Sequence, residues 1–246
     1  ASRESEDPYR LDEAGFPRDH VTEEALRFLS ENKNSPFFLY YASWLVHSPL
    51  QSRSQELLRK YCEKLGVDYP TNPKGWLLEG QRNPYYCAMV ESLDHYIGKM
   101  LKYLERTDDP RWPGHKLVEN TYLVFTSDNG GMEGHHEEVF TDNLPLDKGK
   151  IYIREGGIRV PFIIAGPNIP SAVESDVVVN GLDLHPTILG WTNTPPNAGQ
   201  ILDGSDLGDM LLVDPQDDKR IISPQTNKPR ESMFWHFPNG YCQQSA

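Results

Sequence analysis

A short apolar run that ends in Asp-Asn-Gly-Gly constrains the fold of this chain more than any other feature. Residues 121–126 are mostly β-branched or aromatic and include no acid or base, and residues 128–131 follow as Asp-Asn-Gly-Gly. This pattern predicts a strand buried on both faces, as in the middle of a parallel sheet. In open α/β sheets, ligands bind beyond the carboxyl ends of the strands, where Asp128 and Asn129 would project.

The side chains of Asp128 and Asn129 also indicate the kind of ligand. An adjacent carboxylate and amide offer hard oxygen ligands, which suit calcium or magnesium better than zinc. The sequence Asp-Asn-Gly-Gly is also favoured in turns, so an ordinary strand-to-turn junction is the alternative interpretation. The other loops of the chain bear on this choice.

Two further apolar runs are predicted as strands, and each lies beside a polar segment. Residues 37–42 lead into a loop that carries His47. Residues 160–165 follow a glycine-punctuated basic segment that carries Lys148 and Lys150. If the three strands are neighbours in one sheet, these loops and the Asp-Asn-Gly-Gly turn converge at one edge.

Such a convergence would suit a doubly charged oxyanion. A bound cation and a lysine offset the charge on the oxyanion oxygens, and a histidine such as His47 can pass a proton to a leaving group. Taken singly, a histidine after a strand and a lysine among glycines are ordinary loop residues. The chemical interpretation therefore depends on the three segments coming together.

Helices are predicted between the strands. The clearest covers residues 84–105, where apolar side chains recur on one side at helical spacing. The order strand, helix, strand predicts the α/β class, with a mostly parallel sheet flanked by helices. Shorter predicted elements are helices at 21–30 with Thr22 as N-cap, at 55–65, and at 183–190 with Asp183 as N-cap, and strands at 176–180 and 232–237.

Composition narrows the class of partner. The formal net charge of −12 argues against nucleic acid or an anionic membrane surface as the main partner. No apolar run approaches the ~20 residues that a membrane-spanning helix needs. The three cysteines, at positions 62, 87 and 242, are too scattered for a disulfide framework. A length of 246 residues is enough for one large α/β domain.

Five segments stand in an order that is typical of one enzyme family. They are residues 36–49, 86–104, 126–131, 145–161 and 183–187. In these segments the chain resembles the type I sulfatases, which are arylsulfatase-like members of the alkaline-phosphatase superfamily. The resemblance runs from about residue 21 to residue 190, and more weakly to residue 236.

The resemblance implies an alkaline-phosphatase-like α/β fold and hydrolysis of sulfate esters by a calcium-assisted formylglycine mechanism. In such a site Asp128 and Asn129 would bind calcium, and Lys150 would contact the sulfate. His47 would contact the sulfate or protonate the leaving oxygen. A sulfated small molecule or carbohydrate is the substrate that this resemblance implies.

Other positions follow the family pattern less closely. His136 and His236 are further candidates, for the rim of the substrate site. In the lysine loop, Ile151 stands where the family usually has glycine. Lys148 is therefore an alternative to Lys150 as the lysine that contacts sulfate.

The family's nucleophile has no counterpart in this sequence. Formylglycine is made from the first residue of a Cys-x-Pro-Ser-Arg type motif, and Cys62, Cys87 and Cys242 all stand in other contexts. We therefore expect residues 1–246 to be the later portion of a single sulfatase catalytic domain, with 221–246 as the possible start of a small C-terminal subdomain. The chain alone is expected to be inactive.

Two other functions stay open. One is a phosphate or phosphonate ester hydrolase of the same superfamily, in which the nucleophile would be threonine or serine. The other is a non-catalytic sulfatase-like binding module. The family resemblance also suggests export to the periplasm, the extracellular space or the lysosome, whereas the sequence predicts no oligomeric state.

Overall fold

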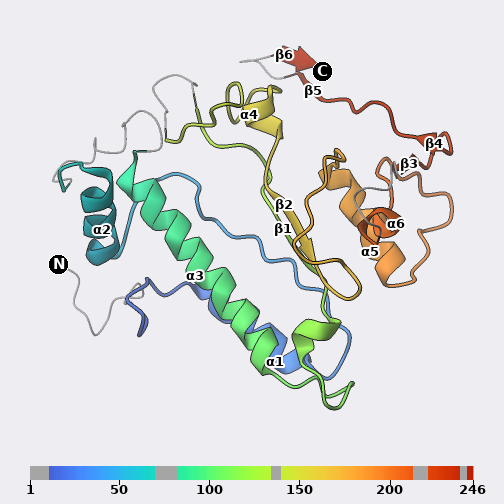
Figure 1. Cartoon of the computed structure of the whole chain (residues 1–246), viewed down its shortest axis with the longest axis horizontal. Coiled ribbons are helices and arrows are strands. Elements are labelled where there is room, and N and C mark those ends of the chain that lie inside the picture. The colour runs from blue at the N-terminus through green and yellow to red at the C-terminus, as the bar shows by residue number, and fades with distance from the viewer. Residues whose placement is uncertain (1–10, 70–81, 134–139, 213–220, 239–242, 246) are drawn as a thin grey trace. The chain divides into compact units, whose positions relative to one another are not determined.

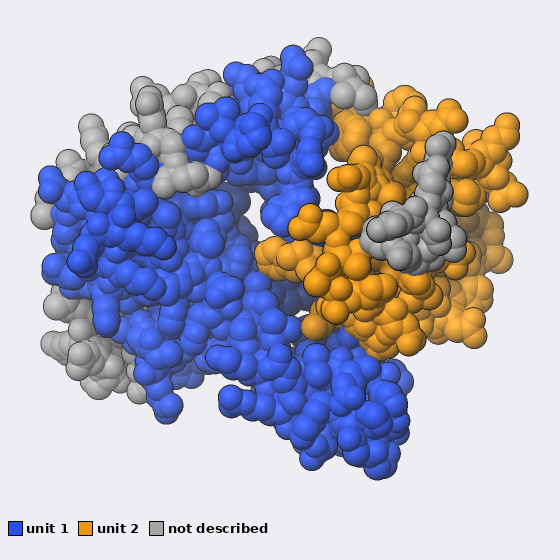
Figure 2. Space-filling model, in the orientation of Figure 1, with its two compact units in different colours: residues 1–121, 126–162 blue, residues 122–125, 163–246 orange. Residues whose placement is uncertain are grey.

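The computed structural model describes residues 11–69, 82–133, 140–212, 221–238 and 243–245 (Figure 1). The chain divides into two compact units, which Figure 2 shows in different colours. The first comprises Ala1–Thr121 and Thr126–Phe162, and the second comprises Tyr122–Phe125 and Ile163–Ala246. The expectation of a single catalytic domain over residues 1–246 stays a prediction.

Three helices form the framework of the first unit. They are α1 (His20–Asn32), α2 (Gln55–Leu65) and α3 (Pro84–Arg106), and α3 packs against both of the others. The predictions at 55–65 and 84–105 are confirmed. Both helices have strong N-terminal signals, since the Ser54 hydroxyl accepts a hydrogen bond from Leu57 N and the Asn83 side chain accepts from the first turn of α3.

The predicted cap of α1 is wrong by one turn. The carboxylate of Asp19, not the hydroxyl of Thr22, caps the helix, and it accepts a hydrogen bond of 2.8 Å from Thr22 N. Thr22 is instead buried within the first turn, where its hydroxyl contacts Asp19 Oδ2 and Tyr41 Oη. The Asp19 carboxylate thus satisfies one of the free N–H groups of the first turn, and the Thr22 side chain is buried in the core.

The apolar core of the first unit lies where α3 meets α1 and α2. On α3, Met89 and Leu104 are buried as the helical spacing predicts, whereas Val90 is exposed. Tyr96 is buried as well, and its hydroxyl is satisfied by donating to the Pro17 carbonyl oxygen. The other buried apolar residues of this core are Ala25, Leu29, Leu50, Leu57, Leu58, Cys62, Ala88 and Leu117, the last in the 3-10 helix η2 (Leu117–Asn120).

The predicted strand at 37–42 is wrong. This run is extended but forms no strand, and Phe38 and Tyr40 are 68% and 81% exposed. An apolar run becomes a buried strand only when neighbouring strands supply hydrogen-bond partners and a covering layer. In the described part of the chain, no strand pairs with this run.

The run at 121–126 does form a strand, but not one that is buried on both faces. Strand β1 (Leu123–Thr126) pairs with β2 (Phe162–Ala165) in a two-stranded sheet (Figure 1). Val124, Phe125 and Ile163 remain exposed, because a sheet of two strands has little of either face covered. The mostly parallel sheet stays a prediction.

The second unit is built from short elements. Helix α5 (Leu184–Trp191) follows the 3-10 helix η3 (Gly181–Asp183), which confirms the helix predicted at 183–190. The remaining elements are α6 (Gly208–Leu211) and two antiparallel pairs, β3 (Ile222–Ser223) with β4 (Lys228–Pro229) and β5 (His236–Pro238) with β6 (Gln243–Ser245).

Two strand predictions in this unit need correction. Residues 176–180 contain no strand, and of the run 232–237 only the end, from His236, is in β5. In the described ranges, neither segment has a neighbouring strand over most of its length, so its apolar residues alone do not form a paired strand. The C-terminal subdomain that was expected over 221–246 stays a prediction.

Asp183 is not the side-chain cap of α5 that the sequence suggested. Its carboxylate is fully buried and makes no capping hydrogen bond to α5. It accepts instead from Ser205 N at 2.8 Å and from both terminal nitrogens of Arg230 at 2.7 and 2.9 Å. The bidentate pair with Arg230 and the hydrogen bond from Ser205 N thus tie η3 to two segments that lie farther along the chain.

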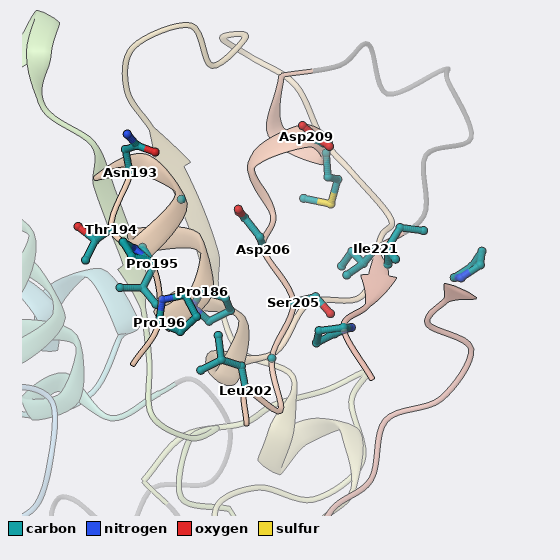
Figure 3. A pocket seen from close by; sticks show the side chains of 17 residues that line it. Pro186, Asn193, Thr194, Pro195, Pro196, Leu202, Ser205, Asp206, Asp209 and Ile221 are labelled. Atoms are coloured by element: carbon teal, nitrogen blue, oxygen red, sulfur yellow. The ribbon is translucent and has the colours of Figure 1, made fainter. Parts of the chain in front are cut away.

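The second unit also contains an open pocket of about 1210 Å³, shown in Figure 3. Its lining is mainly proline and aliphatic, with Asp206 and Asp209 among the few polar side chains. None of the residues predicted for the functional site lines it. Among the described residues, no helix is both long and apolar enough to cross a membrane.

Candidate functional site

His47 and Lys150 meet in the first unit. Lys150 Nζ lies 3.1 Å from His47 Nε2, although the two residues are 103 positions apart in the sequence. His47 follows the extended run 37–42, and Lys150 belongs to the loop that precedes the short helix α4 (Glu155–Ile158). The two loops therefore come together through these side chains, although the run that precedes His47 is not a strand as expected.

The hydrogen bonds of His47 fix the roles of its two ring nitrogens. Nδ1 lies 2.8 Å from the carbonyl oxygen of Ser48, which can only accept, so Nδ1 carries a proton and donates it. In the neutral ring Nε2 then presents a lone pair to the Lys150 ammonium. The backbone holds this arrangement, since His47 N donates to Trp44 O at 2.9 Å.

The lysine loop is joined to the Asp-Asn-Gly-Gly turn by backbone hydrogen bonds. Lys150 N donates to Gly131 O at 2.8 Å, and Gly130 N donates to Gly157 O at 2.9 Å. Asn143 reinforces the junction, because its Nδ2 donates to Gly131 O at 3.1 Å and to Lys148 O at 3.0 Å. Nothing in the sequence marks Asn143 for this role.

Glycines make this junction possible. A Cβ on Gly130 would overlap the carbonyl oxygen of Gly156, and a Cβ on Gly149 would overlap that of Gly131. The two backbones therefore approach more closely than any larger residue allows. The sequence shows the glycines of this segment, but only the structure shows which backbone each of them faces.

Asp128 and Asn129 lie next to this junction. Asp128 is exposed, and Asn129 Nδ2 donates to Gly130 O at 2.9 Å, which leaves its Oδ1 without a donor among the described residues. A carboxylate and an amide oxygen fit calcium in kind, but calcium takes about 6–8 oxygen ligands. In the described ranges, no group of three or more His, Cys, Asp and Glu side chains could hold a metal ion.

The two candidate lysines, Lys148 and Lys150, have different surroundings in the structure. The ammonium of Lys148 lies 5.5 Å from the centroid of the Tyr152 ring, whereas the ammonium of Lys150 contacts His47. Ile151, which stands where the family usually has glycine, has a φ of +83°, in the left-handed region that glycine adopts without strain. The loop thus keeps a conformation suited to glycine with another residue in place.

The two other candidate histidines are not part of the contact between His47 and Lys150. His136 lies outside the described residues. His236 is in β5 of the second unit, opposite Ser245 in the hairpin. Their place at the rim of a substrate site stays a prediction.

Neither described cysteine has the properties of a nucleophile. Cys62 is buried in α2, and Cys87 is half-buried in α3. Burial raises the pKa of both thiols, although Arg59 and Lys64 respectively offset part of the effect. Both side chains therefore favour the unreactive thiol form.

Comparison with known proteins settles the family. The family model described as Sulfatase matches residues 3–194, which is most of the chain. The chain belongs to the sulfatase family. A sulfatase from Formosa agariphila is 34% identical over 215 residues, which cover 85% of this chain and 34% of that protein.

Other sulfatases give the same assignment. Human N-acetylglucosamine-6-sulfatase is 32% identical over 200 residues, covering 76% of this chain and 34% of the relative. A structure solved in work on glycosaminoglycan metabolism by Bacteroides thetaiotaomicron superimposes with a TM-score of 0.57 at 23% identity, over 78% of this chain and 35% of that one. This likeness supports the sulfatase-like fold. The chain spans about a third of the length of the relatives it matches.

Proposed function

We propose that this sulfatase-family chain carries the sulfate-binding part of a site that hydrolyses sulfate esters. The observation that supports the proposal is the 3.1 Å contact between Lys150 Nζ and His47 Nε2, beside a turn that offers two oxygen ligands. A lysine and a histidine that meet at the surface have a clear use when an anion accepts hydrogen bonds from both of them. The family assignment makes a sulfate ester the expected anion.

Each of these residues has a distinct role in the proposed site. The Lys150 ammonium donates to sulfate oxygens and offsets the charge that remains on them as the ester bond breaks. His47 keeps its orientation through Nδ1, which donates to Ser48 O, so that Nε2 points at the reacting group. In its protonated form, Nε2 can donate a proton to the departing alcohol oxygen.

We propose calcium as the cofactor, held in part by Asp128 Oδ and Asn129 Oδ1. When bound there, calcium would supply positive charge beside the sulfate oxygens. The proposed nucleophile is formylglycine, and none of the three cysteines in this sequence stands in the motif that yields it. The proposed enzyme therefore needs residues beyond these 246 for turnover.

We infer two further properties from kinship. The name of the human relative, N-acetylglucosamine-6-sulfatase, favours a sulfated sugar as the substrate of this protein. Membership of the sulfatase family favours an exported protein. We also propose that β1 and β2 belong to the mostly parallel sheet of the sulfatase fold, which the structural likeness supports only at the level of the overall fold.

Binding and turnover test the proposal separately. Isothermal titration of the 246-residue chain with inorganic sulfate should show binding that is stronger than binding of inorganic phosphate. Assays with an aryl sulfate and calcium should show no turnover by this chain. Calcium-dependent turnover would refute the proposed need for further residues, whereas a clear preference for phosphate would favour a phosphate ester hydrolase.

A further inference from the structure

We propose that Trp44 is a specificity-determining residue, whose indole ring stacks on the sugar ring of a sulfated sugar while the sulfate lies at Lys150 and His47. This inference rests on the proposed function and adds to it the part of the site that recognises the alcohol half of the ester. Nothing in the sequence pattern singled out Trp44. The structure does so through its position and its exposure.

Trp44 lies directly beside the sulfate-binding pair. Its ring centroid is 5.4 Å from that of His47, with an angle of 52° between the ring planes. The hydrogen bond from His47 N to Trp44 O, at 2.9 Å, joins the two residues in one turn. The indole thus lies beside the imidazole ring whose Nε2 faces Lys150.

The indole is available for a ligand. Trp44 is 73% exposed, which is unusual for so large an apolar side chain. An exposed aromatic ring next to a polar cluster has the composition of a ligand site, in which flat apolar surface gives contact area and a few polar groups fix orientation. The indole N–H adds a donor at the edge of that surface.

A pyranose ring is a suitable occupant. The C–H groups on one face of the ring form an apolar surface that matches an aromatic ring, while its hydroxyls stay in water. A sulfate on an exocyclic oxygen lies only a few bonds from the ring, so both ends can be engaged at once by neighbouring residues. Contact away from the reacting bond also helps to hold the ester in position for reaction.

Two other exposed aromatic residues provide matched controls. Phe38 and Tyr40 lie on the extended run that leads to Trp44 and are 68% and 81% exposed. Neither makes a ring contact with His47 in the described structure, whereas Trp44 does. Exposure alone therefore does not select a residue for this role, but exposure beside His47 does.

The test compares two probes on the 246-residue chain. N-acetylglucosamine 6-sulfate and inorganic sulfate are titrated separately into the wild type, W44A, W44F and Y40A. We expect W44A to weaken binding of the sugar sulfate by about fivefold, the range of an aromatic stacking contact, and to leave inorganic sulfate within about twofold. W44F should retain most of the affinity, and Y40A should match the wild type.

The outcomes distinguish the two proposals. If W44A binds the sugar sulfate as tightly as the wild type does, or if Y40A loses as much affinity, the role of Trp44 is wrong. If inorganic sulfate does not bind but the sugar sulfate binds in a Trp44-dependent way, the sulfate site is wrong and the stacking role stands. Absence of binding by both probes would overturn both proposals.

Discussion

Lys150 Nζ and His47 Nε2 lie 3.1 Å apart, so two basic side chains from distant parts of the chain face each other at the surface. One hydrogen bond at an exposed position contributes little to stability, about 1 kcal/mol at most. An anion that accepts from the Lys150 ammonium, and from Nε2 of a protonated His47, forms hydrogen bonds between opposite charges, which are stronger than the contact between the two side chains. The arrangement is thus better suited to binding than to holding the fold together.

Replacing Lys150 should separate binding from folding. K150A removes the ammonium that faces His47, and we expect sulfate affinity to fall by about 10-fold or more, as for loss of a charge-assisted hydrogen bond. K148A is the matched control, since the Lys148 ammonium lies over the Tyr152 ring. Isothermal titration with sulfate measures both variants. Equal losses of affinity would show that only the net charge of the loop matters.

Alanine should have opposite effects on stability at two glycines, one at the contact between the two loops and one in helix α3. G130A should lower the free energy of unfolding by about 3 kcal/mol, because the added Cβ overlaps the Gly156 carbonyl and the backbones must separate. G98A, in α3 with open space around its Cα, should raise it by roughly 0.5–1 kcal/mol through helix propensity. Chemical denaturation checks both variants, and a neutral G130A would show that the junction is loose.

The buried pair of Asp183 and Arg230 should be important for the second unit. R230M leaves the fully buried Asp183 carboxylate with only backbone donors. This should lower the free energy of unfolding by about 3–5 kcal/mol. R159A removes an ion pair whose side chains are both well exposed, and it should cost less than about 1 kcal/mol. Thermal unfolding compares the two variants. A similarly small decrease in Tm for both variants would mean that water reaches Asp183 once Arg230 is replaced.

Helices were more predictable than strands in this chain, for a physical reason. The caps and periodic apolar positions of α2 and α3 lie within the helices themselves or one residue away, so the sequence contains most of the information. A strand needs partners from elsewhere in the chain. The run at 37–42 has strand composition but no paired neighbour among the described residues, and its Phe38 and Tyr40 side chains remain exposed.

In the candidate site, too, some features were predictable from the sequence and others were not. His47 and Lys150 were predictable as residue types at their places in a family pattern, and the structure brings them into contact. The support that positions them was not predictable, because it consists of backbone contacts between loops. Asn143 has an ordinary loop context in the sequence, yet its amide bridges Gly131 and the lysine loop.

A final prediction concerns the contact between Asp12 and helix α3. The Asp12 carboxylate accepts from His95 Nε2 at 2.8 Å and from the backbone N–H groups of Phe16 and Ala14. Burial by itself raises the pKa of this carboxyl, but the hydrogen bonds from His95 and the backbone outweigh it and hold the pKa below the usual value. The contact therefore requires the ionised carboxylate.

The sign of the pH dependence follows from the lowered pKa. A group whose pKa is lower in the folded state adds stability that is fully present above its unfolded pKa and is lost as the pH falls through the folded pKa. D12N should therefore lower the free energy of unfolding by about 1 kcal/mol at neutral pH, and the difference from wild type should shrink below about pH 4. D94N, at an exposed position of α3, is the control and should show no such difference. Chemical denaturation across this pH range measures both, and a constant difference between D12N and wild type would rule out titration of Asp12 as its source.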